Sequence, residues 1–121
     1  MSSVFDHVFI KYNKKKKSVY YVVHTQYKYF SLRYGKWVHC HVCMKSDGAT
    51  NAMDIDSFSW LVHDKICDIG LFQDGTKCTN KQASMIISDI LKSEGKWFRA
   101  KTWFVATWLF GGGKARKNGL L

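Results

Sequence analysis

The hydrophobic pattern of the chain changes its period once, between Ser46 and Gly70, and this change limits the fold more than any other feature. Upstream of Ser46, β-branched and aromatic residues alternate loosely with polar ones, as in strands. Further along, apolar residues recur every three or four positions, as in helices. A chain of 121 residues has the size of one domain. The sequence therefore predicts a single α+β domain, residues 1–121, with an N-terminal antiparallel β-meander of three to four strands packed against three C-terminal helices.

The first 45 residues form a β-rich basic part that opens with a predicted hairpin. Residues 4–12 and 18–26 are rich in β-formers, and a polar turn separates them. The turn carries four consecutive lysines, Lys14, Lys15, Lys16 and Lys17. Such a turn is typical of a solvated hairpin tip that blocks edge pairing. The same lysines are candidates for binding phosphate or an acidic protein surface.

Residues 27–32 and 37–44 are predicted to form further strands. Alternation along the second of them places one set of side chains on a core face, namely Val38, Cys40, Val42 and Met44. His39 and His41 share the other face, roughly 7 Å apart, so they are candidate metal ligands. Zinc would need at least one more ligand, for which Cys43 lies on the same side. We expect no metal or other cofactor, and a half-exposed aromatic and imidazole surface instead.

The helical part, residues 46–110, begins with a predicted helix that ends at Gly70. Asp54 or Asp56 can cap its start, because a carboxylate accepts hydrogen bonds from the free amides of a first turn. Gly70 suits a left-handed C-terminal cap. A second helix is predicted from Thr79, which forms a capping-box pattern with Gln82, and Gly95 closes that helix. Both ends of each of these two helices are thus predicted from cap residues.

Residues 97–110 are predicted to form the third helix, and aromatic residues occur on several of its sides. A helix that is apolar on many sides is buried against more than one neighbour, which can be another chain. Trp103, Trp108 and Phe110 are therefore candidates for a partner interface. A Gly-rich basic tail, residues 111–121, follows and is expected to behave as a flexible linker. Lys114, Arg116 and Lys117 in this tail are further candidates for binding nucleic acid or an acidic partner.

The net charge of +10 is unevenly distributed. Residues 1–45 contain nine Lys and Arg against one acid, residues 46–95 contain four against eight, and residues 96–121 contain six against none. An acidic middle is thus flanked by two basic ends. This polarity favours phosphate or an acidic protein surface as the partner of the ends.

Four cysteines, Cys40, Cys43, Cys67 and Cys78, are expected to be free thiols. The reason is that the N-terminus lacks the continuous apolar core of a signal peptide, so a reducing compartment is expected. No apolar run approaches the roughly 18 residues of a membrane span. We therefore expect neither secretion by a signal peptide nor a membrane span.

Three segments in order resemble a known family. They are Ser46-Asp47-Gly48-Ala49-Thr50, then Val62-His63-Asp64, then a capped helix leading through Gly95 to an aromatic helix that ends in Leu109-Phe110-Gly111. Over residues 44–112 this order resembles a tailed-phage and prophage family, the domain of unknown function thirteen-fifty-three. The chain departs from the family pattern at three places: Asn51-Ala52 replaces Ile-Pro, Cys67 replaces an aromatic residue, and Ser84 after Ala83 replaces an aspartate.

Asp47, His63 and Asp64 are the polar residues of the family pattern that remain, and they are the candidate catalytic residues. In a hydrolase, Asp47 would orient His63, or all three would bind a metal that activates water. The structural interpretation is that Asp47 makes a turn and His63 is a satisfied buried histidine. We favour the structural interpretation, because Ser84 replaces a fourth polar residue.

The resemblance and the charge pattern together predict a small phage protein that is a non-enzymatic binding or structural component. It would be associated with the virion or tail, or act as an accessory factor, through its basic ends and aromatic helix. Its expected partners are other phage proteins or a second copy of itself, in the host cytoplasm during infection or in the virion. One alternative is a small hydrolase, directed at the cell wall. The other is a nucleic-acid-binding protein that uses its lysines together with Tyr20, Tyr27 and Tyr29.

Overall fold

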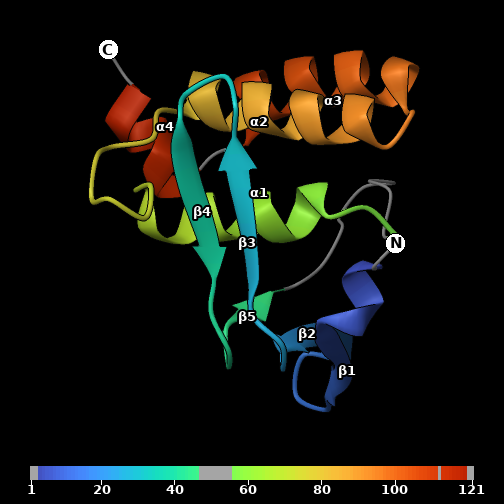
Figure 1. Cartoon of the computed structure of the whole chain (residues 1–121). Helices are drawn as coiled ribbons and strands as arrows, with labels where there is room; N and C mark the ends of the chain where they lie inside the picture. The colour runs from blue at the N-terminus through green and yellow to red at the C-terminus, as the bar shows by residue number, and fades with distance from the viewer. Residues whose placement is uncertain (1–2, 47–55, 112, 120–121) are drawn as a thin grey trace.

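The computed structural model describes residues 3–46, 56–111 and 113–119, and it confirms the α+β class (Figure 1). Antiparallel strands come first and helices follow. In chain order the elements are η1 (Val4–Asp6), β1 (Val8–Asn13), β2 (Ser18–Val23), β3 (Tyr27–Ser31), β4 (Lys36–Cys40), β5 (Lys45–Ser46), α1 (Ser59–Ile69), α2 (Asn80–Ser93), α3 (Trp97–Phe110) and α4 (Gly113–Gly119). No helix within the described ranges is long and apolar enough to cross a membrane.

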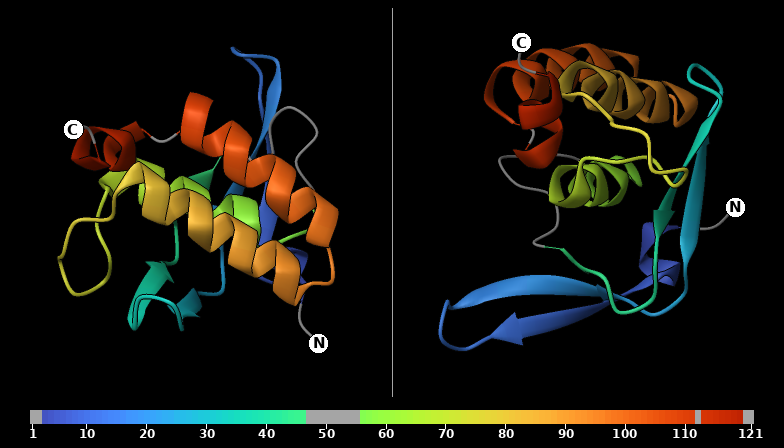
Figure 2. Two further views of the ribbon diagram at one scale, coloured as in Figure 1. Left: turned by 90° about the horizontal axis from the view of Figure 1, so that it is seen from above. Right: turned by 90° about the vertical axis from the view of Figure 1, so that its left-hand side faces the viewer.

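The strands form two small sheets rather than one meander. β2 pairs with β1 on one side and with β5 on the other, while β3 pairs with β4 only. The break falls between β2 and β3, where the amides of His24 and Thr25 both donate to the carbonyl of His7. The chain therefore turns away from the first sheet. Figure 2 shows the result: the β1–β2 hairpin extends away from the helices, whereas β3 and β4 run beside α1.

The predicted strands are shorter in the structure, and the second of them ends at Val23. The first begins only at Val8, because Ser3 and Asp6 form a capping box that makes Val4–Asp6 a 3-10 helix. The strand predicted over residues 37–44 stops at Cys40, and Cys43 takes a positive φ of 74° in the turn that follows. This turn breaks the predicted alternation. Val42 is consequently 50% exposed and not in the core.

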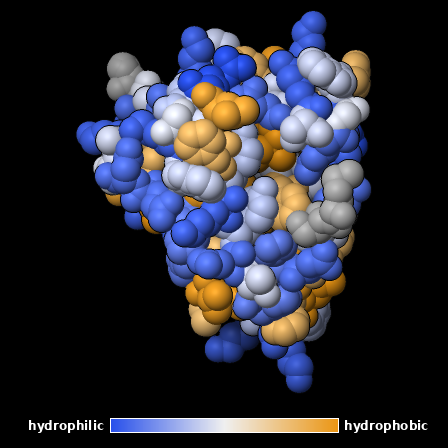
Figure 3. All heavy atoms as spheres, in the orientation of Figure 1, coloured by the Kyte–Doolittle hydropathy of each residue, from blue (hydrophilic) through white to orange (hydrophobic). Residues whose placement is uncertain are grey.

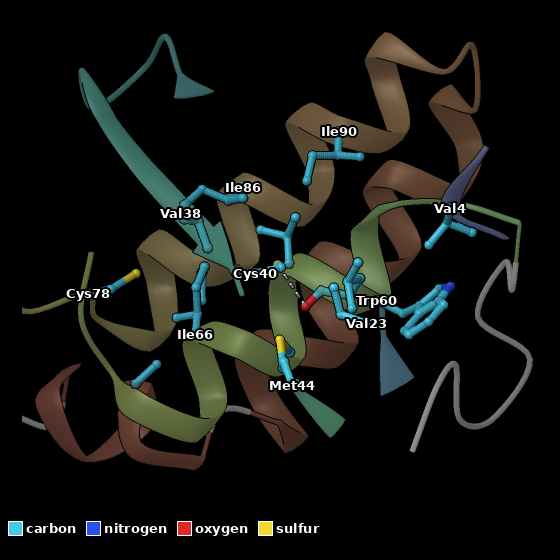
Figure 4. Packing of buried hydrophobic residues seen from close by; sticks show 14 of the residues in the cluster. Val4, Val23, Val38, Cys40, Met44, Trp60, Ile66, Cys78, Ile86 and Ile90 are labelled. Atoms are coloured by element: carbon cyan, nitrogen blue, oxygen red, sulfur yellow. Dashed lines mark hydrogen bonds between the residues drawn. The ribbon is translucent and has the colours of Figure 1, made fainter. Parts of the chain in front are cut away.

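The core surrounds α1. Trp60, Leu61 and Ile66 of this helix are fully buried. In Figure 4, side chains of β2 and β4, such as Val23 and Val38, and side chains of α2 converge on the same cluster. Burying a side chain of this size stabilises the fold by roughly 1.5–3 kcal/mol. The burial of α1 between the strands and α2 therefore stabilises the fold, in agreement with the apolar pattern of its sequence.

The start of α1 is capped from another helix. Asp54 lies outside the described residues, and Asp56 makes no cap, because the helix begins three residues after it. The carboxylate of Glu94 accepts hydrogen bonds instead, from the amide of Phe58 at 3.2 Å and from the hydroxyl of Ser57 at 2.6 Å. The prediction was therefore wrong for Asp56, and the first amide of the helix, that of Ser59, donates to the hydroxyl of Ser57 at 3.0 Å.

The other predicted boundaries are confirmed. Gly70 ends α1 with φ 68°, in the left-handed region. Thr79 and Gln82 form a capping box at the start of α2, with bonds of 3.1 Å and 2.9 Å. Gly95 separates α2 from α3. Local cap chemistry therefore determines where these helices end.

The segment expected to be a flexible tail contains a fourth helix, α4. Ala115 of α4 is fully buried, and the side chain of Asn118 donates to the carbonyl of Gly70 at 2.5 Å. Gly113 has φ 48°, and a Cβ there would lie 2.5 Å from the carbonyl oxygen of Cys67. The glycine therefore permits a close approach of α4 to α1. Charge and glycine content predicted a linker because neither reveals this long-range contact.

Candidate functional site

A groove of about 790 Å³ runs between the β1–β2 hairpin, β5 and α1; we call it the β5 groove. Its lining includes lysines from the hairpin turn and from β5, and carboxylates and a thiol from α1. The residues that matter below are Lys16, His41, Lys45, Asp64, Cys67 and Asp68. It is larger than a second hollow of about 550 Å³, which is lined by residues of β3 and α2 among others.

The structure separates two members of the predicted catalytic set, and Asp47 lies outside the described residues. Asp64 lines the β5 groove and accepts a hydrogen bond from the hydroxyl of Ser46, which joins β5 to α1. His63 is 8% exposed and does not line the groove. The backbone of Gly111 lies beside the His63 ring. Consecutive helical residues diverge in direction, which explains the separation.

His63 instead contacts Cys67, one turn further along α1, with its Nε2 atom 3.3 Å from Sγ. Burial lowers the pKa of His63 to about 4. The ring is therefore neutral near pH 7, and burial would disfavour the imidazolium of a thiolate–imidazolium pair. An activated cysteine nucleophile needs a cationic neighbour of that kind. The contact is thus poorly suited to nucleophilic catalysis.

The predicted metal ligands His39 and His41 are engaged by other side chains. Their ring centroids are 6.5 Å apart. His39 Nε2 lies 2.9 Å from the amide oxygen of Gln26, and His41 Nδ1 lies 2.9 Å from the ammonium of Lys65. A metal ion would be repelled by that ammonium. Within residues 3–46, 56–111 and 113–119, no three His, Cys, Asp or Glu side chains are placed to bind a metal ion.

The lysines of the hairpin turn are exposed at its tip. Asn13 shapes this turn, since its side-chain oxygen accepts hydrogen bonds from the amides of Lys15 and Lys16 at 3.0 and 3.1 Å. Lys14, Lys15, Lys16 and Lys17 thus form one exposed basic cluster, which we call the hairpin lysines. Tyr20 flanks the hairpin lysines and lines the β5 groove.

Tyr27 and Tyr29 are less available for stacking on a nucleic-acid base. Tyr27 stacks on Phe58, with ring centroids 4.1 Å apart. Burial raises the pKa of each of the two tyrosines to about 12. Both rings pack against the core cluster around α1. The nucleic-acid alternative therefore retains only Tyr20 of its predicted aromatic residues.

The basic residues of the last helix divide into two groups. Lys114 and Lys117 are exposed on α4. Arg116 folds back on α3, and its guanidinium donates, at 3.0 Å each, to the carbonyls of Trp108, Leu109 and Gly111. These carbonyls lie at the C-terminal end of α3, where a helix leaves its last acceptors without partners. Arg116 therefore closes α3, and the two lysines are available to an external partner.

α3 packs against α2 along one side only. Ala100 and Thr107 are its buried residues, and Trp103 packs against Ala100 and the α2 residues Ile87 and Leu91. Of the predicted interface residues, Trp108 is 44% exposed and Phe110 is 86% exposed. The side away from α2 carries further exposed apolar residues, Phe98, Val105 and Leu109. We call this side the outer face of α3.

Sequence reasoning missed the contacts that organise the β5 groove. Lys65 and His41 come from α1 and from the turn after β4, and Ser46 and Asp64 are 18 residues apart. No local pattern marks either contact. The four-residue spacing of His63 and Cys67 was a visible signal, because residues four apart share one helix face.

The chain was also compared with known proteins. Searches of protein-family models, curated proteins and solved structures found no match.

Proposed function

We propose that this protein is a non-enzymatic component of a tailed phage that binds an acidic partner through its basic ends and through α3. The phage context rests on the resemblance of residues 44–112, and the binding role rests on the surface described above. The acidic partner is another phage protein, in the virion or tail or in an assembly that forms in the host cytoplasm.

The main support for this proposal is the exposed position of the β1–β2 hairpin. It extends away from the helices, and both of its faces expose large apolar residues (Figure 2). Phe9 is 55% exposed, Ile10 is 63% exposed and Tyr12 is 59% exposed. In Figure 3, hydrophobic residues gather at the end of the molecule where this hairpin lies, with hydrophilic residues beyond them. Apolar residues beside the hairpin lysines suit a partner with an acidic rim and an apolar centre.

The outer face of α3 supports the same role. Phe98 is 83% exposed, and no acidic residue occurs from residue 96 to the end of the chain. Several large apolar residues exposed on one side of a helix are typical of a protein–protein contact. The hydrolase alternative has less support, because His63 is neutral and lies off the β5 groove. The nucleic-acid alternative is favoured by one observation, the exposure of the hairpin lysines.

A cross-linking experiment tests the proposal. A photoreactive amino acid is placed at Tyr12 on the hairpin, at Phe98 on α3, and at Gln73 as an exposed control. In purified particles, or in infected cells, we expect positions 12 and 98 to cross-link to defined phage proteins and position 73 to give none. Absence of cross-links from both test positions, in particles and in cells, would contradict the proposal.

Salt dependence separates the nucleic-acid alternative from a protein partner. A single-stranded oligonucleotide that contacts the hairpin lysines should lose affinity steeply with salt, with a logarithmic slope of about 0.7 for each phosphate contact. Replacing the four lysines with serine should flatten that slope. Oligonucleotide binding with these properties, without protein cross-links, would establish the alternative.

A further inference from the structure

Lys65 of α1 is a buried cation without a carboxylate partner in the described chain. The residue is 9% exposed, and its ammonium lies 2.9 Å from Nδ1 of His41. None of the ion pairs found among the described residues includes Lys65. Its helical neighbour Asp64 turns to Ser46 instead. A buried ammonium is costly unless its hydrogen bonds are satisfied, so this position needs an explanation.

The contact with Lys65 assigns different hydrogen-bonding roles to the two ring nitrogens of His41. An ammonium has only donors, so Nδ1 of His41 must accept and carries no proton. The ring proton is then on Nε2, on the other side of the ring. His41 is exposed and lines the β5 groove, and none of the described residues bonds to Nε2. The pair thus offers a fixed N–H donor next to a buried positive charge.

Two further cations line the same groove. Lys16 comes from the hairpin turn and Lys45 from β5. Asn13, Ser18 and Tyr20 add neutral hydrogen-bonding groups to the wall. A phosphate group needs several donors of this kind, and lysine binds it as a point charge. The α1 wall differs, because Asp64 and Asp68 place carboxylates there.

We propose that the β5 groove binds a phosphate ester, with the phosphate held by His41, Lys16 and Lys45. Lys65 acts behind His41 as a positioning residue, since it fixes the tautomer and supplies positive charge. Asp68, on the α1 wall of the groove, accepts a hydrogen bond from a hydroxyl or amino group of the same ligand. The ligand class is therefore a sugar phosphate or nucleotide, either free or as part of a nucleic-acid chain.

This inference rests on the proposed function in one respect, namely that the basic N-terminal part binds anions. It adds a defined site and a ligand class that the hairpin lysines alone do not provide. The two ideas fail separately. Removing the hairpin lysines should weaken binding of a large acidic partner, whereas changes in the β5 groove should weaken binding of a small phosphate ester.

The first measurement is a titration of the full chain by calorimetry and by NMR, in a buffer free of phosphate. The probes are ribose 5-phosphate, inorganic phosphate and ribose. We expect ribose 5-phosphate to bind more tightly than inorganic phosphate, and ribose not to bind. The imidazole nitrogen signals of His41 should show the Nε2–H tautomer in the free protein, and the Nε2 proton should shift on binding.

Two variants with the same change in charge test the role of Lys65. Lys65→Met removes the ammonium and keeps the buried stem, and replacing an unpaired buried charge with an apolar group is compatible with folding. Lys28→Met removes an exposed lysine of β3 that does not line the groove. We expect ribose 5-phosphate to bind Lys65→Met about ten- to a hundredfold more weakly, as for the loss of a charged hydrogen bond. Lys28→Met should bind like the natural chain, and Lys65→Met should also lose the fixed tautomer of His41.

A third variant separates this site from the hairpin. Substitution of Lys14, Lys15 and Lys17 with serine retains Lys16 in the groove. It should bind ribose 5-phosphate normally while it loses the cross-links or oligonucleotide binding of the proposed function. One further outcome tells whether the natural ligand is a free small molecule or part of a nucleic-acid chain. Only in the second case should ribose 5-phosphate compete with a single-stranded oligonucleotide for the groove. The inference is overturned if ribose 5-phosphate does not bind, or if ribose binds as tightly as ribose 5-phosphate. It is also overturned if Lys65→Met and Lys28→Met bind ribose 5-phosphate with equal affinity.

Discussion

α1 and α3 are both rich in apolar residues, yet the fold uses them differently. Seven of the 11 residues of α1 are buried, against two of the 14 residues of α3. α1 lies between the strands and α2, whereas α3 lies beyond α2 and has a neighbour on one side (Figure 1). Apolar composition alone therefore does not distinguish a core helix from a helix with a free face. The first helix stabilises the fold, and the second is suited to an external partner.

The largest expected effect is the difference between matched leucine substitutions in the two helices. Leu61 of α1 is fully buried and Leu109 of α3 is 51% exposed. Leu61→Ala should lower the free energy of unfolding by about 2–5 kcal/mol, because it creates a cavity. Leu109→Ala should lower it by less than about 1 kcal/mol. Denaturant titration of both variants measures this, and equal losses would show that α3 is also part of the core.

The buried histidine of α1 should make stability depend on pH. The pKa of His63 is about 4 in the folded chain, against an ordinary value of 6.5. Between these values the unfolded chain binds more protons, so stability is complete above about pH 6.5 and falls as the pH approaches 4. The shift corresponds to a loss of about 3 kcal/mol.

Unfolding titrations of the natural chain and of His63→Phe over this pH range test that expectation. The variant has no group to protonate at this position, so its stability should fall less. His24→Phe is the control, because His24 lies at the end of β2 and not in the core. If the unfolding free energies of the natural chain and of His63→Phe fall in parallel with pH, another titrating group causes the loss of stability.

A smaller effect concerns the glycine that brings α4 against α1. Gly113→Ala combines a positive φ with a Cβ only 2.5 Å from a backbone oxygen, so we expect a loss of about 2–3 kcal/mol. Gly75→Ala also has a positive φ but meets nothing within 4 Å, so it should cost about 1 kcal/mol. Thermal unfolding compares the two variants. Equal losses of unfolding free energy in the two variants would indicate that α4 does not pack against α1 in solution.

The smallest effect on stability is expected on the outer face of α3. Phe98→Ser should change the free energy of unfolding by less than about 0.5 kcal/mol, since Phe98 contributes little to the core. It should nevertheless abolish cross-linking from a photoreactive residue at Tyr12 if both surfaces bind the same partner. Denaturant titration and cross-linking are measured on the same preparation. A stable variant with undiminished cross-linking would remove α3 from the interface.

The sequence predicted the fold class, because local signals agree with the final structure. The capping box of Thr79 and Gln82, the glycine at the end of α1 and the limits of α3 were all visible in short segments. Some errors arose where distant residues decide, and others where a local turn or capping box interrupts a strand pattern. Glu94 caps α1 from the end of α2, and the turn around Cys43 ends β4 and redirects Val42.

The candidate site was predictable only in part. His41, His63 and Asp64 were recognised as polar residues of interest, and Asp47 lies outside the described residues. The contact of His41 with Lys65 was not visible, since it joins α1 to the turn after β4. A pattern along one strand placed His41 with His39, whereas the fold gives it a cationic partner. Charge counts likewise grouped Arg116 with the lysines of α4, although its guanidinium is bonded to α3.

The arrangement of α4 has a consequence for biosynthesis. Ala115 is fully buried, and Asn118 bonds to Gly70, which lies 48 residues earlier, so α1 gains neighbours that are synthesised long after it. Domains generally fold as units during synthesis. The nascent chain can therefore complete the native contacts of α1 only after α4 has left the exit tunnel. An early stop codon that removes α4 should yield an aggregation-prone product, not a shortened functional protein.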